Sequence, residues 1–233
     1  MEHLFDTHFH LDLQKNKADV IKEIEENGIY TIAVTNLPDL YRKESVEVAS
    51  KYIRFGLGFH PELIHQYANQ IPLMWDLLPE TRYIGEVGLD FVDTSFRNEQ
   101  MRFFSDLIER CRYDRDKVLS IHSRRAVRQV LDIIGENYRF KPILHWFSGN
   151  KRELLDAVST GFYFSVNGAM MVSKRFLDLL PMIPKERLLL ETDSPFTSFN
   201  GSHSDTLCRI EQELRLHVPD VDVWSNFRRV LSI

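Results

Sequence analysis

The chain has 233 residues, of which 43% are hydrophobic and 27% are charged, as in ordinary folded globular proteins. Its formal net charge of −5 excludes a uniformly basic surface of the kind that coats nucleic acids, so any anionic substrate must be bound locally by a metal ion or a few Lys and Arg residues. The sequence shows no secretory signal and no apolar run of membrane-spanning length, and its only cysteines are Cys111 and Cys208. We therefore expect a cytoplasmic protein that does not contact membranes and has no disulfide framework.

The first predicted strand, residues 3–10 ("HLFDTHFH"), carries polar side chains at every second position. Asp6, His8 and His10 share one face of such a strand, while phenylalanines lie on the other. An acid and two imidazoles buried together need a partner, and a divalent metal ion binds all three. The alternative is an exposed edge strand whose polar residues face water.

Short β-rich runs alternate with longer amphipathic runs along the rest of the chain. The further predicted strands are residues 29–36, 53–60, 83–90, 118–124, 141–149, 161–169 and 187–195. Amphipathic helices are predicted between strands, among them residues 17–28, 39–52 and 96–117. Eight strand-and-helix units without a linker predict one domain over residues 1–233, with the α/β fold of a closed (β/α)8 TIM barrel. The rival, a doubly wound open sheet, lacks support because neither G-x-G-x-x-G nor G-x-x-x-x-G-K is present.

Most candidate functional residues lie at the carboxyl ends of the predicted strands, where barrels of this kind place their active sites. They are His8, His10, His60, Glu86, Asp90, His122, His145 and Asp193. Five of the nine histidines belong to this set, which favours one shared metal centre over separate structural roles. A turn-forming role stays open for His60, because a proline follows it.

Glu86 lies in an apolar strand between Gly85 and Gly88, where even a neutral polar group without a partner would cost roughly 2–7 kcal/mol. It is therefore the expected bridging ligand. Asp90 and Glu191 are weaker ligand candidates, and ion pairing inside the barrel mouth is the simpler role for Glu191. Imidazole and carboxylate ligands without thiolates favour zinc, manganese or iron, with magnesium where carboxylates and water dominate. Six ligands exceed the needs of one tetrahedral ion, so we expect two divalent ions, Mg, Mn or Zn, as cofactors.

Seven motifs in a fixed order carry a resemblance to a known family. They are "DTHFHLD", "GFHP", "GEVGLD", "NEQMRFF", "IHSR", "HWFSG" and "ETDSPF". From Asp6 to about Phe196 this pattern resembles the TatD family of metal-dependent deoxyribonucleases, which are amidohydrolase-like barrels, and "NFRRVL" is similar to the family's closing helix.

The resemblance implies a set of site residues. One metal site would use His8, His10, Glu86 and Asp193. The second would use Glu86, His122 and His145. His60 would contact the substrate phosphate or assist its protonation.

The chain departs from the family after "ETDSPF", where "TSFNGSHSDT" replaces a Pro-rich stretch, and its tail is short. The departure puts the shape of the substrate site at the barrel mouth in doubt. A compact variant of this kind is similar to the TatD-like component of Qat anti-phage defence systems. That similarity implies partner proteins from a defence cassette.

The predicted function is hydrolysis of phosphodiester bonds in DNA, single-stranded or at its ends, in an exonuclease-type reaction with a water activated by two metal ions. The catalytic candidates are Asp193 as general base, His60 as hydrogen-bond donor and Arg124 as a ligand of the DNA backbone. One alternative is an amidohydrolase acting on a small carbonyl compound, although many such enzymes bridge their metals with a carboxylated Lys where this chain has Glu86. The other is a metal-binding, non-catalytic subunit of a defence complex, against which the intact ligand set weighs.

Further cationic and aromatic residues follow the strands on the predicted barrel rim. The cations are Arg125, Arg128, Lys151, Arg152, Lys174 and Arg175. They could hold a nucleic-acid backbone, but solvated positions at helix starts are the favoured interpretation for most of them. Trp146 and Phe147 could stack on bases, but burial against the barrel wall is the favoured interpretation for both.

Overall fold

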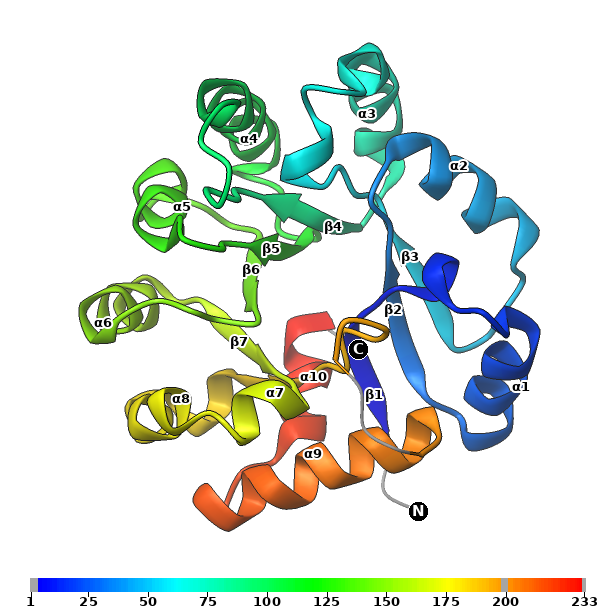
Figure 1. Cartoon of the computed structure of the whole chain (residues 1–233), viewed down its shortest axis with the longest axis vertical. Helices are drawn as coiled ribbons and strands as arrows, with labels where there is room; N and C mark the ends of the chain where they lie inside the picture. The colour runs from blue at the N-terminus through cyan, green and yellow to red at the C-terminus, as the bar shows by residue number, and fades with distance from the viewer. Residues whose placement is uncertain (1–3, 198–200, 232–233) are drawn as a thin grey trace.

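Short parallel strands form the inner wall of the molecule (Figure 1). The computed structural model describes residues 4–197 and 201–231. Within these ranges the strands are β1 (Phe5–Phe9), β2 (Tyr30–Val34), β3 (Ile53–Gly56), β4 (Tyr83–Gly88), β5 (Val118–His122), β6 (Lys141–His145), β7 (Tyr163–Val166) and β8 (Leu188–Leu190). Every predicted strand is found, although each is shorter than the sequence pattern suggested, and the predicted first strand starts at His3, outside the described residues.

The strands pair in chain order and the cylinder closes at two seams. Regular ladders join β1, β2 and β3, and then β4 through β8. At the first seam, between β3 and β4, the backbone N–H of Phe59 donates to the carbonyl of Glu86 at 2.9 Å. At the second seam, the N–H of Asp193 donates to the carbonyl of His8 at 2.9 Å and the N–H of His10 to that of Ser194 at 3.2 Å. The α/β prediction of a closed (β/α)8 barrel is confirmed.

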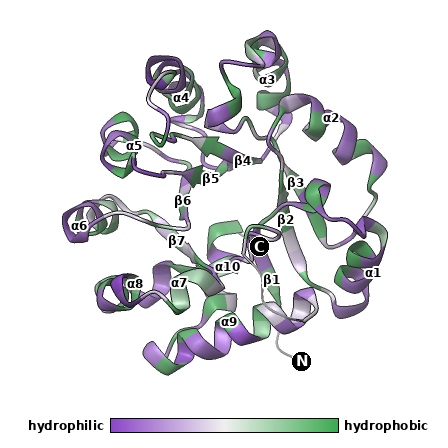
Figure 2. Ribbon diagram, in the orientation of Figure 1, coloured by the Kyte–Doolittle hydropathy of each residue, from purple (hydrophilic) through white to green (hydrophobic). Residues whose placement is uncertain are grey.

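Helices cover the strands, and most of them form a ring around the barrel (Figure 1). They are α1 (Lys17–Asn27), α2 (Pro38–Glu47), α3 (Ile71–Leu77), α4 (Arg97–Cys111), α5 (Val127–Ile134), α6 (Lys151–Thr160), α7 (Gly168–Met171), α8 (Lys174–Leu179), α9 (His203–His217) and α10 (Val223–Leu231). In Figure 2 these helices carry both hydrophilic and hydrophobic segments, as expected for helices with one face against a barrel. Among the described residues, none of the helices has the length and apolar character needed to cross a bilayer.

Two helices end earlier than their sequence pattern predicted. The chain leaves α2 after Glu47, and the Ser50 hydroxyl then accepts the N–H groups of Tyr52 and Ile53 as the chain turns into β3. After α4, the Asp114 carboxylate accepts the N–H of Asp116 at 2.9 Å. Both stops are local side-chain turns, which compete with helix continuation.

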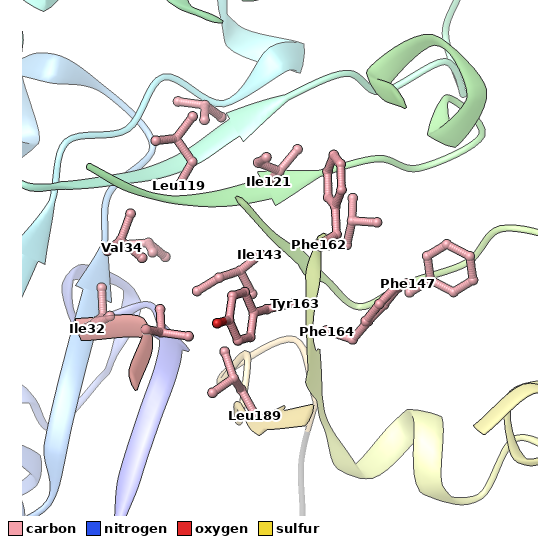
Figure 3. Packing of buried hydrophobic residues seen from close by; sticks show 14 of the residues in the cluster. Ile32, Val34, Leu119, Ile121, Ile143, Phe147, Phe162, Tyr163, Phe164 and Leu189 are labelled. Carbon is pink, nitrogen blue, oxygen red and sulfur yellow. The ribbon is translucent and has the colours of Figure 1, made fainter. Parts of the chain in front are cut away.

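Alternate residues of the strands point into the barrel or toward the helices (Figure 3). Ile143, Tyr163 and Leu189 gather inside the barrel, while Phe164 lies on the outer side near Phe147, with ring centroids 5.6 Å apart. These apolar side chains fill the barrel interior before the carboxyl ends of the strands, where the polar residues lie.

The closing helix α10 packs at the opposite end, where the strands begin. Its Phe227 stacks on Phe5 of β1 with ring centroids 4.3 Å apart. The Asn226 amide donates to the carbonyl oxygens of Lys185 and Leu188 at 2.6 and 2.9 Å, at the start of β8. The helix therefore fastens the first and last strands of the barrel together.

Candidate metal centre

One buried carboxylate lies against all five histidines of the strand ends. Glu86, on β4, has its Oε1 atom 2.6 Å from Nδ1 of His122, 2.9 Å from Nε2 of His145 and 3.6 Å from Nε2 of His60. Its Oε2 atom lies 3.5 Å from Nε2 of His10 and 3.8 Å from Nε2 of His8. The two oxygens thus face two separate groups of imidazoles.

Close backbone packing sets the position of Glu86. Gly88, two residues further along β4, has φ +140° and lies so close to β5 that a Cβ there would be 2.0 Å from the carbonyl oxygen of His122. Only glycine permits this approach. The "GEVG" pattern therefore brings β4 against β5, with Glu86 beside His122.

The first group of ligand candidates comes from the two strands that meet at the closing seam. His8 and His10 have Nε2 atoms 3.3 Å apart, and Asp193 places Oδ1 3.8 Å from the first and 3.4 Å from the second. His8 lies in β1, whereas His10 and Asp193 lie just beyond the ends of β1 and β8. With Glu86 Oε2 they form a compact set of two imidazoles and two carboxylates.

The second group lies around the other oxygen of Glu86. Nδ1 of His122 and Nε2 of His145 are 3.2 Å apart. His60, four residues after the end of β3, belongs to the same group, because His60, Glu86 and His122 offer atoms within 4.8 Å of one another. The structure thus brings together all six predicted ligands and the predicted catalytic residues His60 and Asp193.

Both groups fit divalent cations by the chemistry of their donors. Within each group, imidazole nitrogens face one another beside a carboxylate oxygen, an arrangement that a cation between them would stabilise. No cysteine takes part, since Cys111 is buried away from the site and Cys208 lies on α9. Nitrogen and oxygen donors suit zinc and manganese, and magnesium where water completes the shell.

Charge and burial set the protonation states of these groups. Burial opposes ionisation of Glu86, but the imidazoles of His60, His145 and His122 outweigh it and hold its pKa well below the usual value. Burial, together with the His145 ring, lowers the pKa of His8 well below its usual value, and burial lowers that of His60 to about 4. Both imidazoles are therefore neutral at pH 7, which is the form that His8 needs in order to bind a metal ion.

Hydrogen bonds fix the orientation of the rings. The Ser120 hydroxyl lies 2.7 Å from Nδ1 of His8, which leaves Nε2 directed at Glu86 and His10. Asp90 is not in the ligand cluster but lies 2.9 Å from Nε2 of His122. The bonds of His122 to Asp90 and Glu86 outweigh burial and raise its pKa to about 9, so a cation that binds at Nδ1 must displace a proton from this ring.

Nδ1 of His60 accepts the N–H of Glu62 at 3.3 Å, so the neutral ring carries its proton on Nε2. That N–H points toward Glu86, whose Oε1 is 3.6 Å away. His60 can therefore donate a hydrogen bond in the neutral form.

Two further acids of the barrel mouth accept hydrogen bonds from their neighbours. Asp6 does not reach the metal cluster. It accepts the N–H groups of His8 and Thr192 at 3.0 and 3.1 Å and the Thr192 hydroxyl at 2.5 Å. Glu191 accepts hydrogen bonds from Ser165, Asn167 and the N–H of Trp146. Its Oε1 also lies 3.9 Å from Nδ1 of His145, and it offers a ligand atom within 4.8 Å of those of His8 and His145, so both an ion pair in the barrel mouth and a ligand role stay open for it.

The cluster opens into a cavity of about 670 Å³ at the barrel mouth. Arg124 lines it with a side chain that is 61% exposed and lies 3.9 Å from Asp90. Two exposed aromatic side chains, Trp146 and Phe196, also line it. The Phe196 ring contacts the His10 ring edge-on, with centroids 5.1 Å apart.

The predicted burial of Trp146 is wrong, whereas that of Phe147 is confirmed. Trp146 follows β6 with φ +40°, a left-handed conformation that costs a non-glycine residue about 1–2 kcal/mol and turns its indole out of the strand pattern. Arg128 lies at the start of α5, as the favoured interpretation has it, and its guanidinium pairs with Asp156 at 2.6 Å and Asp132 at 3.2 Å.

Several residues of the site were not predicted. Ser120 lies two residues before His122 on β5, so strand alternation could have placed it on the same face. Phe196 belongs to "ETDSPF", but nothing in its spacing signals exposure. Asn36, which lines the cavity, follows β2 at the same barrel edge as the histidines.

A closed barrel with imidazoles and carboxylates gathered at the carboxyl ends of its strands defines a metal-dependent hydrolase of the amidohydrolase-like type. The comparisons with known proteins agree. The family model of the TatD related DNases matches residues 5–211. The chain belongs to this family.

Relatives and solved structures support the assignment. The metal-dependent hydrolase YabD of Bacillus subtilis is 27% identical over 218 residues, which cover 87% of this chain and 85% of the relative. The 3'-5' ssDNA/RNA exonuclease TatD of Erwinia tasmaniensis is 26% identical over 199 residues, which cover 78% of this chain and 74% of the relative. The crystal structure of YJJV, a TatD homologue from Escherichia coli K12, matches with a TM-score of 0.80 at 19% identity, over 99% of this chain and 98% of the other, and shows the same fold.

Proposed function

We propose that this protein hydrolyses phosphodiester bonds at the ends of single-stranded DNA, with two divalent cations bridged by Glu86. The observation that carries the proposal is the division of the Glu86 oxygens between two groups of imidazoles, with Oε1 toward His122 and His145 and Oε2 toward His8 and His10. A carboxylate placed in this way suits a bridge between two ions.

The proposed ligands are those expected from the sequence. His8, His10, Glu86 and Asp193 would hold one cation. Glu86, His122 and His145 would hold the other, with Mg, Mn or Zn as the ion. When bound, the cations supply Lewis-acid activation of a phosphoryl group and of water, and they neutralise developing negative charge.

Three side chains of the cavity perform the remaining steps. The Asp193 carboxylate, at the mouth of the cluster, accepts the proton of the attacking water. His60 donates its Nε2 proton as a hydrogen bond to a phosphate oxygen or to the leaving oxygen. Arg124, which extends over the cavity, binds a neighbouring phosphate through its guanidinium group.

The exposed aromatics favour a single strand as substrate. Trp146 is 36% exposed and Phe196 is 60% exposed, and both line the cavity. Unpaired bases stack on aromatic rings, whereas bases inside a duplex are already stacked on one another. The name of the Erwinia tasmaniensis relative, a 3'-5' ssDNA/RNA exonuclease, agrees with this substrate class.

The test is a metal-by-substrate screen. Purified protein is incubated with end-labelled single-stranded DNA, a DNA hairpin, RNA, a small phosphodiester dye and a dihydropyrimidine-type amide, each with Mg²⁺, Mn²⁺, Zn²⁺ or chelator. We expect stepwise shortening of single-stranded DNA that chelator abolishes. Amide turnover without DNA cleavage would instead identify an amidohydrolase. Full metal occupancy with no turnover of any substrate would identify a binding subunit.

A Glu86→Gln variant tests the bridge itself. The substitution keeps the size of the side chain but removes its charge, so cation uptake and activity should be lost together. Full activity of the variant would refute the bridging role. Cytoplasmic location and a part in anti-phage defence with partner proteins of a cassette stay predictions from the sequence.

A further inference from the structure

A second cavity lies on the barrel rim between α6 and α8, outside the metal centre. It has a volume of about 480 Å³ and is lined by Asn150, Lys151, Lys174, Arg175, Asp178 and Leu179. Its lining therefore includes three cationic side chains and one acidic side chain. We call this cavity the α6–α8 groove.

The groove lies a short distance along the chain from the metal centre. In the loop from β6 to α6, Trp146 and Ser148 line the metal cavity, and Asn150 lines the groove. Only Gly149 separates Ser148 from Asn150, and consecutive Cα atoms are about 3.8 Å apart, so these two lining residues have Cα atoms no more than about 8 Å apart. A polynucleotide that leaves the metal cavity along this loop can reach the groove.

The loop and α8 are joined, which fixes the groove relative to the cluster. Nη2 of Arg175 donates a hydrogen bond to the carbonyl of Gly149 at 2.9 Å. A Cβ at Gly149 would lie 2.5 Å from the ring of Phe147, so the loop packs closely on the barrel wall.

Helix stability does not explain the lysines of the groove. Over residues 4–197 and 201–231, neither Lys151 nor Lys174 has an ion pair within 4.0 Å. Each is the first residue of its helix, where the helix dipole disfavours a positive charge. Both side chains are exposed, so both are available to an anion from outside.

We propose that the α6–α8 groove is a second substrate site, which binds backbone phosphate of the same polynucleotide whose scissile bond lies at the metal centre; this inference rests on the proposed function. Lys151 and Lys174 act as point charges toward the phosphate, with Arg175 beside them. A phosphate contact does not recognise the bases. It therefore increases affinity and orients the polynucleotide without sequence preference.

The binding test compares two double variants. Lys151→Gln/Lys174→Gln removes the groove lysines, and Lys51→Gln/Lys185→Gln removes two exposed lysines near the starts of β3 and β8 as a matched control. Binding of a fluorescent oligothymidylate is measured by anisotropy over a series of salt concentrations, with EDTA present to prevent cleavage. We expect the groove variant to raise Kd several-fold and to flatten the slope of log K against log salt by about 0.7 for each phosphate that the variant no longer neutralises. The control should match wild type.

A length comparison separates this inference from the proposed function. The groove variant should lower kcat/KM for the oligonucleotide but not for bis(p-nitrophenyl) phosphate, which is too small to reach from the metal cavity to the groove. Unchanged Kd, salt slope and kcat/KM would overturn the groove while leaving the hydrolase intact. If wild type cleaves neither substrate, the proposed function fails, and the anisotropy still decides the groove. Thermal unfolding should show a Tm no lower than that of wild type, because the substitutions remove no ion pair within the protein.

Discussion

Replacing Asp90 by Asn should weaken cation binding at Nδ1 of His122. The substitution acts through the proton on the other ring nitrogen, Nε2, which faces Asp90. In the native protein the Asp90 carboxylate, 2.9 Å from Nε2 of His122, holds a proton on that nitrogen and leaves Nδ1 to serve as a ligand. In Asp90→Asn, the amide cannot simply rotate, because Oδ1 also accepts the N–H of Val92 at 2.8 Å. The amide NH₂ therefore faces Nε2 and favours the tautomer protonated at Nδ1.

The expected magnitude follows from these contacts. One hydrogen bond inside the protein is exchanged and the bond from Val92 is kept, so the free energy of unfolding should fall by only about 1 kcal/mol. Loss of a partner that orients a ligand lowers metal affinity by roughly 10- to 100-fold. This corresponds to about 1.4–2.8 kcal/mol of binding free energy.

Isothermal titration calorimetry with Mn²⁺ and Zn²⁺, together with thermal unfolding, measures both quantities. Asp93→Asn is the matched control, because Asp93 is exposed and its carboxylate accepts only local bonds, such as the N–H of Ser95 at 2.8 Å. Wild-type cation affinity in Asp90→Asn would refute the tautomer argument. An equal reduction in Asp93→Asn would attribute the effect to net charge alone.

Three further outcomes are expected. Arg124→Ala should raise KM for single-stranded DNA with little change in kcat, and Arg125→Ala, which removes an exposed neighbouring cation, should not; equal effects in steady-state kinetics would contradict the assignment. Trp146→Ala should weaken oligonucleotide binding by about 1–3 kcal/mol in anisotropy titrations while hydrolysis of a small diester continues at the native rate, and unchanged binding would exclude stacking. Burial raises the pKa of the Cys111 thiol to about 12, so at pH 8 it should resist alkylation until the protein unfolds, as peptide mapping after iodoacetamide treatment would show; rapid labelling of the folded protein would contradict the packing of α4.

The sequence predicts the centre of the site well because barrel geometry is repetitive. Parallel strands present their carboxyl ends at one edge, so imidazoles as distant in sequence as His8 and His145 could be expected to converge. The directions in which individual side chains point were harder to predict. The turn after β6 exposes Trp146 through a left-handed backbone that alternation does not anticipate.

The roles of the acids depend on contacts across strands. Asp90 and Glu191 are both ligand candidates in the sequence, but Asp90 bonds to His122. Glu191 bonds to Ser165 and Asn167 and also lies near the ligand atoms of His8 and His145. Asp6 shares its spacing with His8, yet the register of β1 against β2 shifts between Asp6 and Phe9. The role of each acid therefore depends on contacts with residues that are remote in sequence.

The hydrogen bonds from Thr192 to Asp6 have a consequence for folding during protein synthesis. The two residues are 186 positions apart. His8 and His10 therefore leave the ribosome long before Asp193 has been synthesised. A chain translated short of Asp193 therefore lacks one member of the ligand group formed with His8 and His10. Closure of the seam between β8 and β1 and completion of this ligand group are thereby the same event.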